Sequence, residues 1–452
     1  MILAILALVG AVLLAASAEA RLKFSPPQTL SPTGQSASDP TLAIDSQDRA
    51  TVAWLRFDGA NERIESVRVG ADGIPGEVST LLATASDSLL GPQVAVDPQA
   101  RTTVVWERDT LAVNASDCSP TTNTTCVQGV RFDVSGNPGT LQTLARFDTP
   151  ERDPDLGGPG DGPQAAVDAQ GRVTVVWRRL EYTAAGADST VQSVRLGADG
   201  APGTVQTLSE NGAGEPKVAV DSQGRATVVW PRDRRIESVR LGADGTPEAV
   251  KTLSKRGQNA DSPEVAVDPQ GGATVVWRRA DRAKRRIQSV RLGADGAPEA
   301  VKTLSKGADS PEVAVDPRGR STVVWRRIKQ TKRSLVVRVQ SVHLDADGAP
   351  RAVKTLSKER AFDPQVAVDR RGRATVVWER LRLGGGGISR IEARHLSARG
   401  APEPVQTLAK AEGVGSPEVA VDSKHRPTVV WALSELSVGG LIQSARAEIG
   451  AG

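Results

Sequence analysis

The stretch VAVDPQGGATVVWRR, residues 265–279, recurs with small changes along the whole chain of 452 residues. Every copy contains one tryptophan, and the spacings between successive tryptophans are 52, 71, 53, 47, 48, 53 and 53 residues. Self-similarity at such a period is typical of repeat proteins, in which each unit buries its faces against its neighbours. The eight units are marked by Trp54, Trp106, Trp177, Trp230, Trp277, Trp325, Trp378 and Trp431.

Each unit predicts four short β-strands, which in the fifth unit cover residues 263–268, 273–279, 287–292 and 299–305. An Asp-Pro-x-Gly turn joins the first two strands, and a Gly-Ala-Asp-Gly turn joins the last two. Val, Ile and Thr are frequent in these segments and helical periodicity is absent. The sequence therefore predicts two antiparallel hairpins per unit.

The two ends of the repeat array complement each other. The last unit stops after its third strand, LIQSARAEI (441–449), whereas residues 22–31, LKFSPPQTLS, resemble a fourth strand. The tetrad Gln-Thr-Leu-Ser at 28–31 matches the fourth-strand tetrads at 206–209 and 406–409. A ring closed by strand exchange explains this split, because it leaves no exposed edge. We expect an all-β protein, a single eight-bladed β-propeller with four antiparallel strands per blade, closed by its N-terminal strand.

The first residues indicate export. An apolar run from Ile2 to Ala18 is followed by an Ala-x-Ala pattern ending at Ala20, which is typical of a secretory signal. The run lacks a preceding Lys or Arg, so an uncleaved N-terminal anchor remains the alternative. We expect a signal peptide at 1–20, a propeller at 21–452, and a secreted or cell-surface location for a monomer.

Two cysteines, Cys118 and Cys126, lie close together inside an irregular insertion. In an oxidising compartment we expect them to form a disulfide that acts as a local clip, since the loop that it closes is short. A metal site at these cysteines is disfavoured, because no His or further Cys lies nearby in the sequence to complete four ligands.

The repeat resembles the sialidase-like propeller repeats of the BNR or Asp-box type over the whole predicted propeller. The resemblance rests on the PxVAVDxxGxxTVVW hairpin and on the second hairpin, which keeps Asp-Gly at 199–200, 244–245 and 295–296. The Ser and Trp of the Asp-box are missing. The resemblance implies the propeller fold and does not by itself imply a function.

Catalytic motifs are scarce. The catalytic set of sialidases contains three arginines, a Tyr and Glu pair and an Asp, but the only tyrosine here, Tyr182, lies in a predicted loop, and no catalytic residue is carried over. The histidines His343, His395 and His425 occupy different repeat positions. No nucleophile elbow and no phosphate-binding loop are present, so no cofactor is expected. Paired carboxylates could still hydrolyse a glycan without leaving a sequence signature.

Three repeated residue types are interpreted as structural. The Asp that ends the first strand is expected to accept backbone N–H groups of its own turn, rather than to form a ring of ligands. An Arg four residues later occurs in seven units, with Gly272 in the other, and is expected to be structural as well. The tryptophans are expected to pack between blades, and not to form a sugar-binding platform.

Function is expected on the face that holds the second-to-third-strand loops and the connections between blades, because these segments hold the length variation. One of them is the insertion at 114–127, with glycosylation sequons at Asn114 and Asn123. Another contains Asp153, Asp155 and Asp161, which could bind calcium or could belong to a solvated loop.

The third feature of this face is basic. Residues 231–338 contain 24 Lys or Arg and 13 Asp or Glu, a net charge of +11, whereas the whole chain carries +4. We predict an anion-binding face above blades four to six, with solvated loop charges as the alternative. Its candidate residues are Arg278, Arg279, Arg282, Lys284, Arg285, Arg286, Arg326, Arg327, Lys329, Lys332 and Arg333.

These observations favour an exported, non-enzymatic binding scaffold for an acidic polysaccharide or an anionic cell surface. Nucleic acid is the least favoured partner, because the basic loops contain no interleaved aromatic residues on which bases could stack. The competing hypothesis is a glycan-acting hydrolase or lyase. Convergent carboxylates or a perturbed acid pair at the mouth of the central channel would favour the enzyme, whereas a plain, pseudo-symmetric mouth would favour the scaffold.

Overall fold

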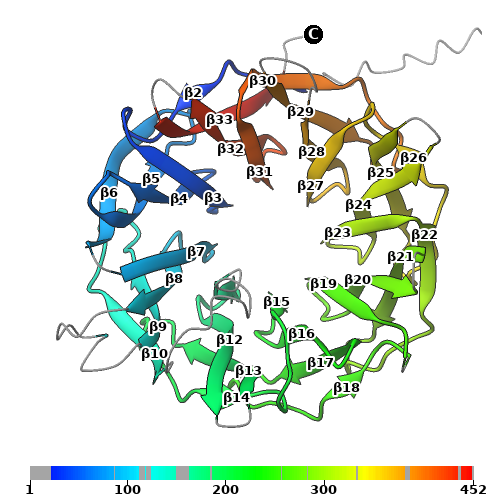
Figure 1. The fold of residues 1–452 in the computed structure, drawn as a ribbon, viewed down its shortest axis with the longest axis horizontal. Coiled ribbons are helices and arrows are strands. Elements are labelled where there is room, and N and C mark those ends of the chain that lie inside the picture. Colours follow the sequence, from blue (N-terminus) through cyan, green and yellow to red (C-terminus); the bar gives the residue numbers. More distant parts are fainter. Residues whose placement is uncertain are drawn as a thin grey trace, which may run out of the picture.

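A computed structural model describes a closed ring of eight blades around a central axis (Figure 1). The described residues are 22–85, 87–110, 118, 124–148, 162–183, 186–255, 257–281, 284–331, 334–381, 387–435 and 439–449. Their regular structure consists of β-strands, and within these ranges no helix has the length and apolar character needed to cross a bilayer. The predicted all-β, eight-bladed propeller with four antiparallel strands per blade is confirmed.

The blades follow one another in chain order. Blade 1 contains β3 (Ser36–Ile44), β4 (Ala50–Phe57), β5 (Glu62–Val69) and β6 (Pro75–Thr84). Blade 2 contains β7 (Asp87–Val96), β8 (Thr102–Thr110), β9 (Thr124–Arg131) and β10 (Gln142–Asp148). Blade 3 contains β11 (Gln164–Val167), β12 (Val173–Thr183), β13 (Gly186–Leu196) and β14 (Gln206–Thr207). Blade 4 contains β15 (Lys217–Val220), β16 (Ala226–Arg232), β17 (Arg235–Leu241) and β18 (Lys251–Thr252).

The second half of the ring repeats this pattern. Blade 5 contains β19 (Ala260–Val267), β20 (Ala273–Asp281), β21 (Lys284–Leu292) and β22 (Lys302–Lys306). Blade 6 contains β23 (Ala308–Val315), β24 (Ser321–Gln330), β25 (Leu335–Leu344) and β26 (Lys354–Thr355). Blade 7 contains β27 (Ala361–Val368), β28 (Ala374–Arg380), β29 (Ile388–Leu396) and β30 (Gln406–Glu412). Blade 8 contains β31 (Val414–Val421), β32 (Pro427–Glu435), β33 (Gly439–Ile449), β1 (Leu22–Phe24) and β2 (Gln28–Thr29).

Strand boundaries differ from the predicted ones at both edges of a blade. In blade 5 the innermost strand begins at Ala260, before the predicted residue 263, because Ala260 and Asp261 pair with Arg279 and Arg278 ahead of a bulge. The fourth strand begins at Lys302, later than predicted, because Pro298 makes only an isolated bridge and a proline has no N–H to continue the ladder. Tyr182 was expected in a loop, but β12 extends to Thr183 and includes it.

The Asp at the first turn is bonded as predicted. In blade 4 the Oδ1 atom of Asp221 accepts the backbone N–H groups of Gln223 and Arg225, both at 2.9 Å. The Nε of Arg225 donates to Oδ2 of Asp221 at 2.8 Å. The same guanidinium donates to the carbonyl oxygens of Gln270 and Ala294 in blade 5. The repeated Asp and Arg therefore hold their own turn and tie neighbouring blades together.

The tryptophans form the centres of the interblade cores. Trp277 has no exposed surface and packs in blade 5 against Val229, Ile236 and Leu253 of blade 4. Burying a tryptophan removes about 200 Å² from water, which stabilises the fold by about 5 kcal/mol before entropic costs. All eight tryptophans are fully buried in this way, so their predicted packing role is confirmed.

The N-terminal segment completes blade 8. Gln28 and Thr29 pair with Ser444 and Gln443 of β33, in the register that Gln206 and Thr207 adopt toward β13 in blade 3. The next residue, Leu30, is 5% exposed and lies in one core cluster with Ile442 and with Trp54 of blade 1. The chain ends are thus joined through a shared sheet (Figure 1).

We expect Leu30→Ala to reduce the free energy of unfolding by about 2–5 kcal/mol, because it deletes a buried side chain that bridges blades 8 and 1. Hydrogen exchange measures the effect locally, since detachment of the closing strand exposes the amides of β33. Leu208→Ala, at the equivalent position of blade 3, is the control. Equal protection of β33 in both variants would contradict a closing role for Leu30.

Candidate functional site

The central channel is lined by the first strand of each blade. Neighbouring first strands lie in contact around the whole ring, from β3 to β7 and onward to β31, which again contacts β3. Three of the four lining positions repeat as small or branched apolar residues, such as Val265, Ala266 and Val267. The channel wall is therefore largely uniform, and chemical variation is confined to the fourth position.

This variable position precedes the apolar triplet. The first strand of each blade ends at the short Asp turn on the turn face. The variable position lies at the beginning of the strand segment, and therefore toward the face that holds the longer loops. In chain order the ring at this level consists of Thr41, Gln93, Gln164, Lys217, Glu264, Glu312, Gln365 and Glu418. Four of these residues are uncharged, one is the cation Lys217, and three are glutamates.

The charged members of the ring interact electrostatically. The Nζ of Lys217 lies 3.2 Å from Oε1 of Glu264. Burial raises the pKa of Glu312 well above its usual range, Glu264 and Glu418 raise it further, and Lys217 opposes the shift. Burial also raises the pKa of Glu418 to about 7, with Lys217 lowering it and Glu264 raising it. The Glu418 carboxyl is therefore partly protonated at neutral pH.

A further perturbed carboxyl lies next to the same face. Glu379 follows Trp378, at the position that Arg278 and Arg326 occupy in blades 5 and 6. Burial raises the pKa of Glu379 to about 7, with a further contribution from the charge of Asp363, against a hydrogen bond from Ser389. The ionisable groups on this side of the ring are therefore not arranged with eightfold pseudo-symmetry. The raised pKa values of these carboxyls could not be read from the sequence alone.

Each mouth of the channel opens into a cavity. On the loop face a cavity of about 370 Å³ is lined by residues of blades 8, 1 and 2, including Glu418, Asp39 and Gln93. On the turn face a cavity of about 390 Å³ is lined by the repeated turns, including Asp45 and Asp422. The turn carboxylates accept hydrogen bonds from backbone and arginine donors, so the carboxylates left for a ligand at the channel lie on the loop face.

Five of the eight predicted basic residues that the structure describes have partners. Arg278 donates two hydrogen bonds to Asp261, at 2.5 and 2.7 Å, and Arg279 pairs with Asp281. Asp309 pairs with both Arg285 and Arg326, at 2.6 and 2.7 Å. These carboxylates neutralise part of the positive charge that a residue count assigns to the face.

The remaining predicted cations differ from these. Arg327 donates to the carbonyl oxygens of Gly307 and Ile328. Lys284, Arg286 and Lys329 form no ion pair with another described residue. Outside the described residues lie Arg282, Lys332 and Arg333, together with the candidate calcium residues Asp153, Asp155 and Asp161 and the sequons at Asn114 and Asn123.

The basic face continues into a cavity that sequence reasoning missed. Arg360, Arg380 and Arg390 line a cavity of about 320 Å³, together with Glu359 and the apolar Leu381 and Ile388. Arg380 pairs with Glu392 at 3.0 Å, and Glu359 pairs with Arg338 at 2.8 Å. The three arginines come from separate segments of blade 7, so no single stretch of sequence signals them.

The cysteines and histidines have structural positions. The predicted Cys118–Cys126 disulfide is confirmed. His343 and His395 occupy the third-strand position of Arg291, and each contacts a Thr hydroxyl. Burial and the nearby Arg373 lower the pKa of His395 to about 4, so its ring is neutral at pH 7. His425 stands at a left-handed turn position, with φ 69°, beside Asp369.

Comparisons with known proteins assign no family. No family model and no curated protein matches the chain. A protein of unknown function from Dyadobacter fermentans is 11% identical, with 95% of this chain and 99% of that chain covered and a TM-score of 0.47. Puromycin hydrolase is 15% identical, with 90% and 62% covered and a TM-score of 0.46, so the match spans less than two thirds of that chain. NanB with Optactamide is 8% identical, with 94% and 71% covered and a TM-score of 0.44.

The raised pKa of Glu418 predicts a pH-dependent stability. The Glu418 carboxyl ionises with a pKa of about 4.5 in the unfolded chain and of about 7 in the folded protein. The folded state therefore loses stability relative to the unfolded chain as the pH rises from about 4.5 to about 7. Glu418→Gln removes this penalty, so its melting temperature relative to the parent protein should be higher at pH 8 than at pH 5. Glu299→Gln, on an exposed outer segment, is the control, and parallel pH profiles for all three proteins would refute the expectation.

Proposed function

We propose that this protein is an exported, non-enzymatic binding propeller that holds an acidic polymer or an anionic surface against the loop face of blades 5 to 7. The observation that carries the proposal is the cavity lined by Arg360, Arg380 and Arg390. A concave site with several guanidinium groups suits carboxylate or sulfate groups, which Arg binds with paired hydrogen bonds. Export is supported by the apolar run at 2–18 and by the Cys118–Cys126 disulfide.

Three cations without an acidic partner among the described residues extend this cavity into a longer basic surface. This surface, called the basic arc below, consists of the cavity together with Lys284, Arg286 and Lys329. Lys284 and Arg286 lie in blade 5 and Lys329 lies in blade 6, next to the segments that lead to the cavity. Within the described ranges, Arg360 and Arg390 also lack an ion pair, so their charge is available to a ligand. Because these groups are spread over three blades, they match a repeating polyanion better than a small anion.

We expect the protein to bind polygalacturonate with an affinity that falls steeply between about 50 and 200 mM salt, because exposed charges are screened over about 10 Å at 0.1 M. Changing Arg360, Arg390 and Lys329 to Ser should weaken binding at least tenfold, while dextran should bind to neither protein. Titration calorimetry or surface plasmon resonance measures both affinities.

The control removes the same charge elsewhere. Lys251, Lys302 and Lys354 lie on the outer strands of blades 4 to 6, and changing all three to Ser should leave the affinity for polygalacturonate nearly unchanged. Equal losses in the two triple variants would reduce the effect to net charge and would overturn the assignment to the loop face.

A second candidate function is glycan hydrolysis or elimination in the channel, and the glutamate cluster favours it. Glu312 and Glu418 have raised pKa values, which suits a general acid, while Lys217 lies against Glu264. Hydrolysis needs a proton donor and an ionised carboxylate on either side of the bond that breaks. These perturbed carboxyls meet the criterion that would favour the enzyme. The binding function is nevertheless proposed first, because the three strand positions that follow each of them are apolar and offer few hydrogen bonds to a substrate.

Incubation with neutral and acidic polysaccharides, followed by a reducing-end assay, tests the enzyme directly. If the channel is catalytic, Glu312→Gln or Glu418→Gln should lower the rate at least a hundredfold while polygalacturonate binding persists. The binding proposal expects no release of reducing ends by the parent protein. Release that depends on Glu312 or Glu418 would replace it with the enzyme.

A further inference from the structure

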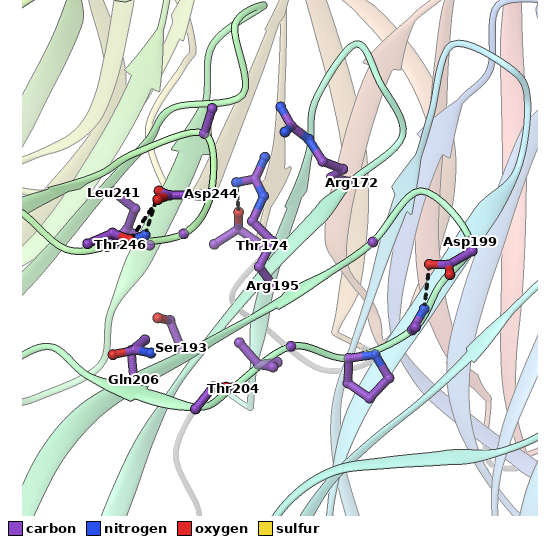
Figure 2. A pocket seen from close by; sticks show the side chains of 17 residues that line it. Arg172, Thr174, Ser193, Arg195, Asp199, Thr204, Gln206, Leu241, Asp244 and Thr246 are labelled. Atoms are coloured by element: carbon purple, nitrogen blue, oxygen red, sulfur yellow. Dashed lines mark hydrogen bonds between the residues drawn. The ribbon is translucent and has the colours of Figure 1, made fainter.

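A groove lies between the second hairpins of blades 3 and 4, on the turn face and therefore opposite to the basic arc. Its volume is about 460 Å³, which falls within the range of about 300–1,000 Å³ typical of ligand pockets. Figure 2 shows Ser193, Thr204 and Gln206 along one side of the groove and Arg172 across from them. The turn that contains Asp244 forms the far wall.

At this groove blade 3 differs from blades 4 and 5, whereas blade 2 has Gly139 and Gln142 at the same positions as blade 3. Gly203 and Gln206 stand where blade 4 has Glu248 and Lys251. In blade 4 the Nζ of Lys251 reaches the next blade and donates to the carbonyl of Asp295 at 3.4 Å. Lys302 of blade 5 does the same to Asp347 at 3.1 Å. A glycine and a shorter amide side chain in blade 3 therefore leave a space that lysine crosses in the following blades.

The charges around the groove are compensated. Arg172 and Arg195 both donate to Oδ2 of Asp168, at 2.7 and 2.5 Å. Hydrogen bonds from the backbone and hydroxyl of Thr246 lower the pKa of Asp244, so this carboxylate is ionised at neutral pH. An anion in the groove would be repelled by the Asp244 carboxylate, and the nearby Arg172 and Arg195 already bind Asp168. The groove therefore differs in character from the basic arc.

The remaining polar groups suit a hydroxyl-rich ligand. The hydroxyl of Thr204 and the amide of Gln206 can each donate and accept hydrogen bonds, and Asp244 adds an acceptor, whereas Ser193 is only 2% exposed. No aromatic residue lines the groove, so a ligand that binds by ring stacking is disfavoured. Small apolar residues such as Pro202 and Val194 cover the rest of the wall.

We propose that this groove binds a neutral oligosaccharide through hydrogen bonds. The groove is independent of the basic arc, because the two lie on opposite faces and because the groove offers hydrogen bonds where the arc offers positive charge. A ligand held by hydrogen bonds in an open groove gains modest net free energy from each bond, so weak binding is expected and ligand-observed NMR is the suitable method.

The experiment uses the full-length protein with maltotriose, xylotriose and triacetylchitotriose as neutral probes and trigalacturonic acid as the charged probe. Saturation-transfer NMR should detect at least one neutral trisaccharide. The double variant Gly203→Glu, Gln206→Lys gives blade 3 the residues of blade 4 and should weaken that binding at least tenfold. The backbone N–H of Gly203 donates to the carbonyl of Arg195 at 2.8 Å, as that of Glu248 donates to Arg240. A Cβ at position 203 would lie 3.1 Å from the Arg195 carbonyl oxygen, so a shift of a few tenths of an ångström accompanies the change.

Two further variants keep the test decisive. Val353→Lys, Val405→Glu adds the same two charges at exposed sites in blades 6 and 7 and should bind the trisaccharide like the parent protein. Glu248→Gly, Lys251→Gln opens the equivalent groove of blade 4 and should raise the number of bound trisaccharides. Binding that survives the blade 3 variant, absence of binding by all neutral probes, or preference for trigalacturonic acid would overturn the proposal. Polygalacturonate binding by the same variants reports separately on the basic arc.

Discussion

Closure of the ring is the constraint on which the rest of this structure depends. Each blade is a four-stranded sheet with two apolar faces, and it can bury them only against two neighbours. Pairing of Gln28 and Thr29 with β33 gives blade 8 its outer strand, while Leu30 joins the core shared with Trp54 of blade 1. Because the ring closes, all eight tryptophans lie between blades, with none left at an exposed end.

In the closed ring, the turn face is nearly constant from blade to blade, whereas the loop face varies. On the turn face, the repeated Asp and Arg side chains bond their own turns and then reach the next blade, as Arg225 does. This face is therefore built from short turns of one design. The opposite face is free to vary, and it holds the glutamates of the channel, the unpaired Lys284 and Lys329 of the described chain, and the arginine cavity of blade 7. Even the turn face holds a groove, between blades 3 and 4, where blade 3 has Gly203 and Gln206 in place of the Glu and Lys of blade 4.

Charge on this protein acts through local pairing more than through net amount. The segment with a net charge of +11 contains several arginines whose charge is already matched, since Asp261 and Asp309 bind Arg278, Arg285 and Arg326. The channel shows the opposite case, because Glu312 and Glu418 lie in a confined space with Lys217 as a nearby cation. Their raised pKa values follow from this confinement, and they are the reason why an enzymatic function is kept as the second candidate.

The sequence by itself determined the fold. The period of the tryptophans, the two turn types and the split fourth strand were sufficient for an eight-bladed ring, because each is a local or repeated signal. The structural roles of the turn Asp and of the tryptophans, and the pairing of Cys118 with Cys126, could also be predicted, since each depends on close neighbours in sequence or on the repeat itself. Tertiary structure alone decided which charges meet. Glu264, Glu312 and Glu418 come from three blades, because closing a ring brings residues together by angle around the axis and not by distance along the chain. Arg360, Arg380 and Arg390 meet because strand pairing within blade 7 places their segments side by side.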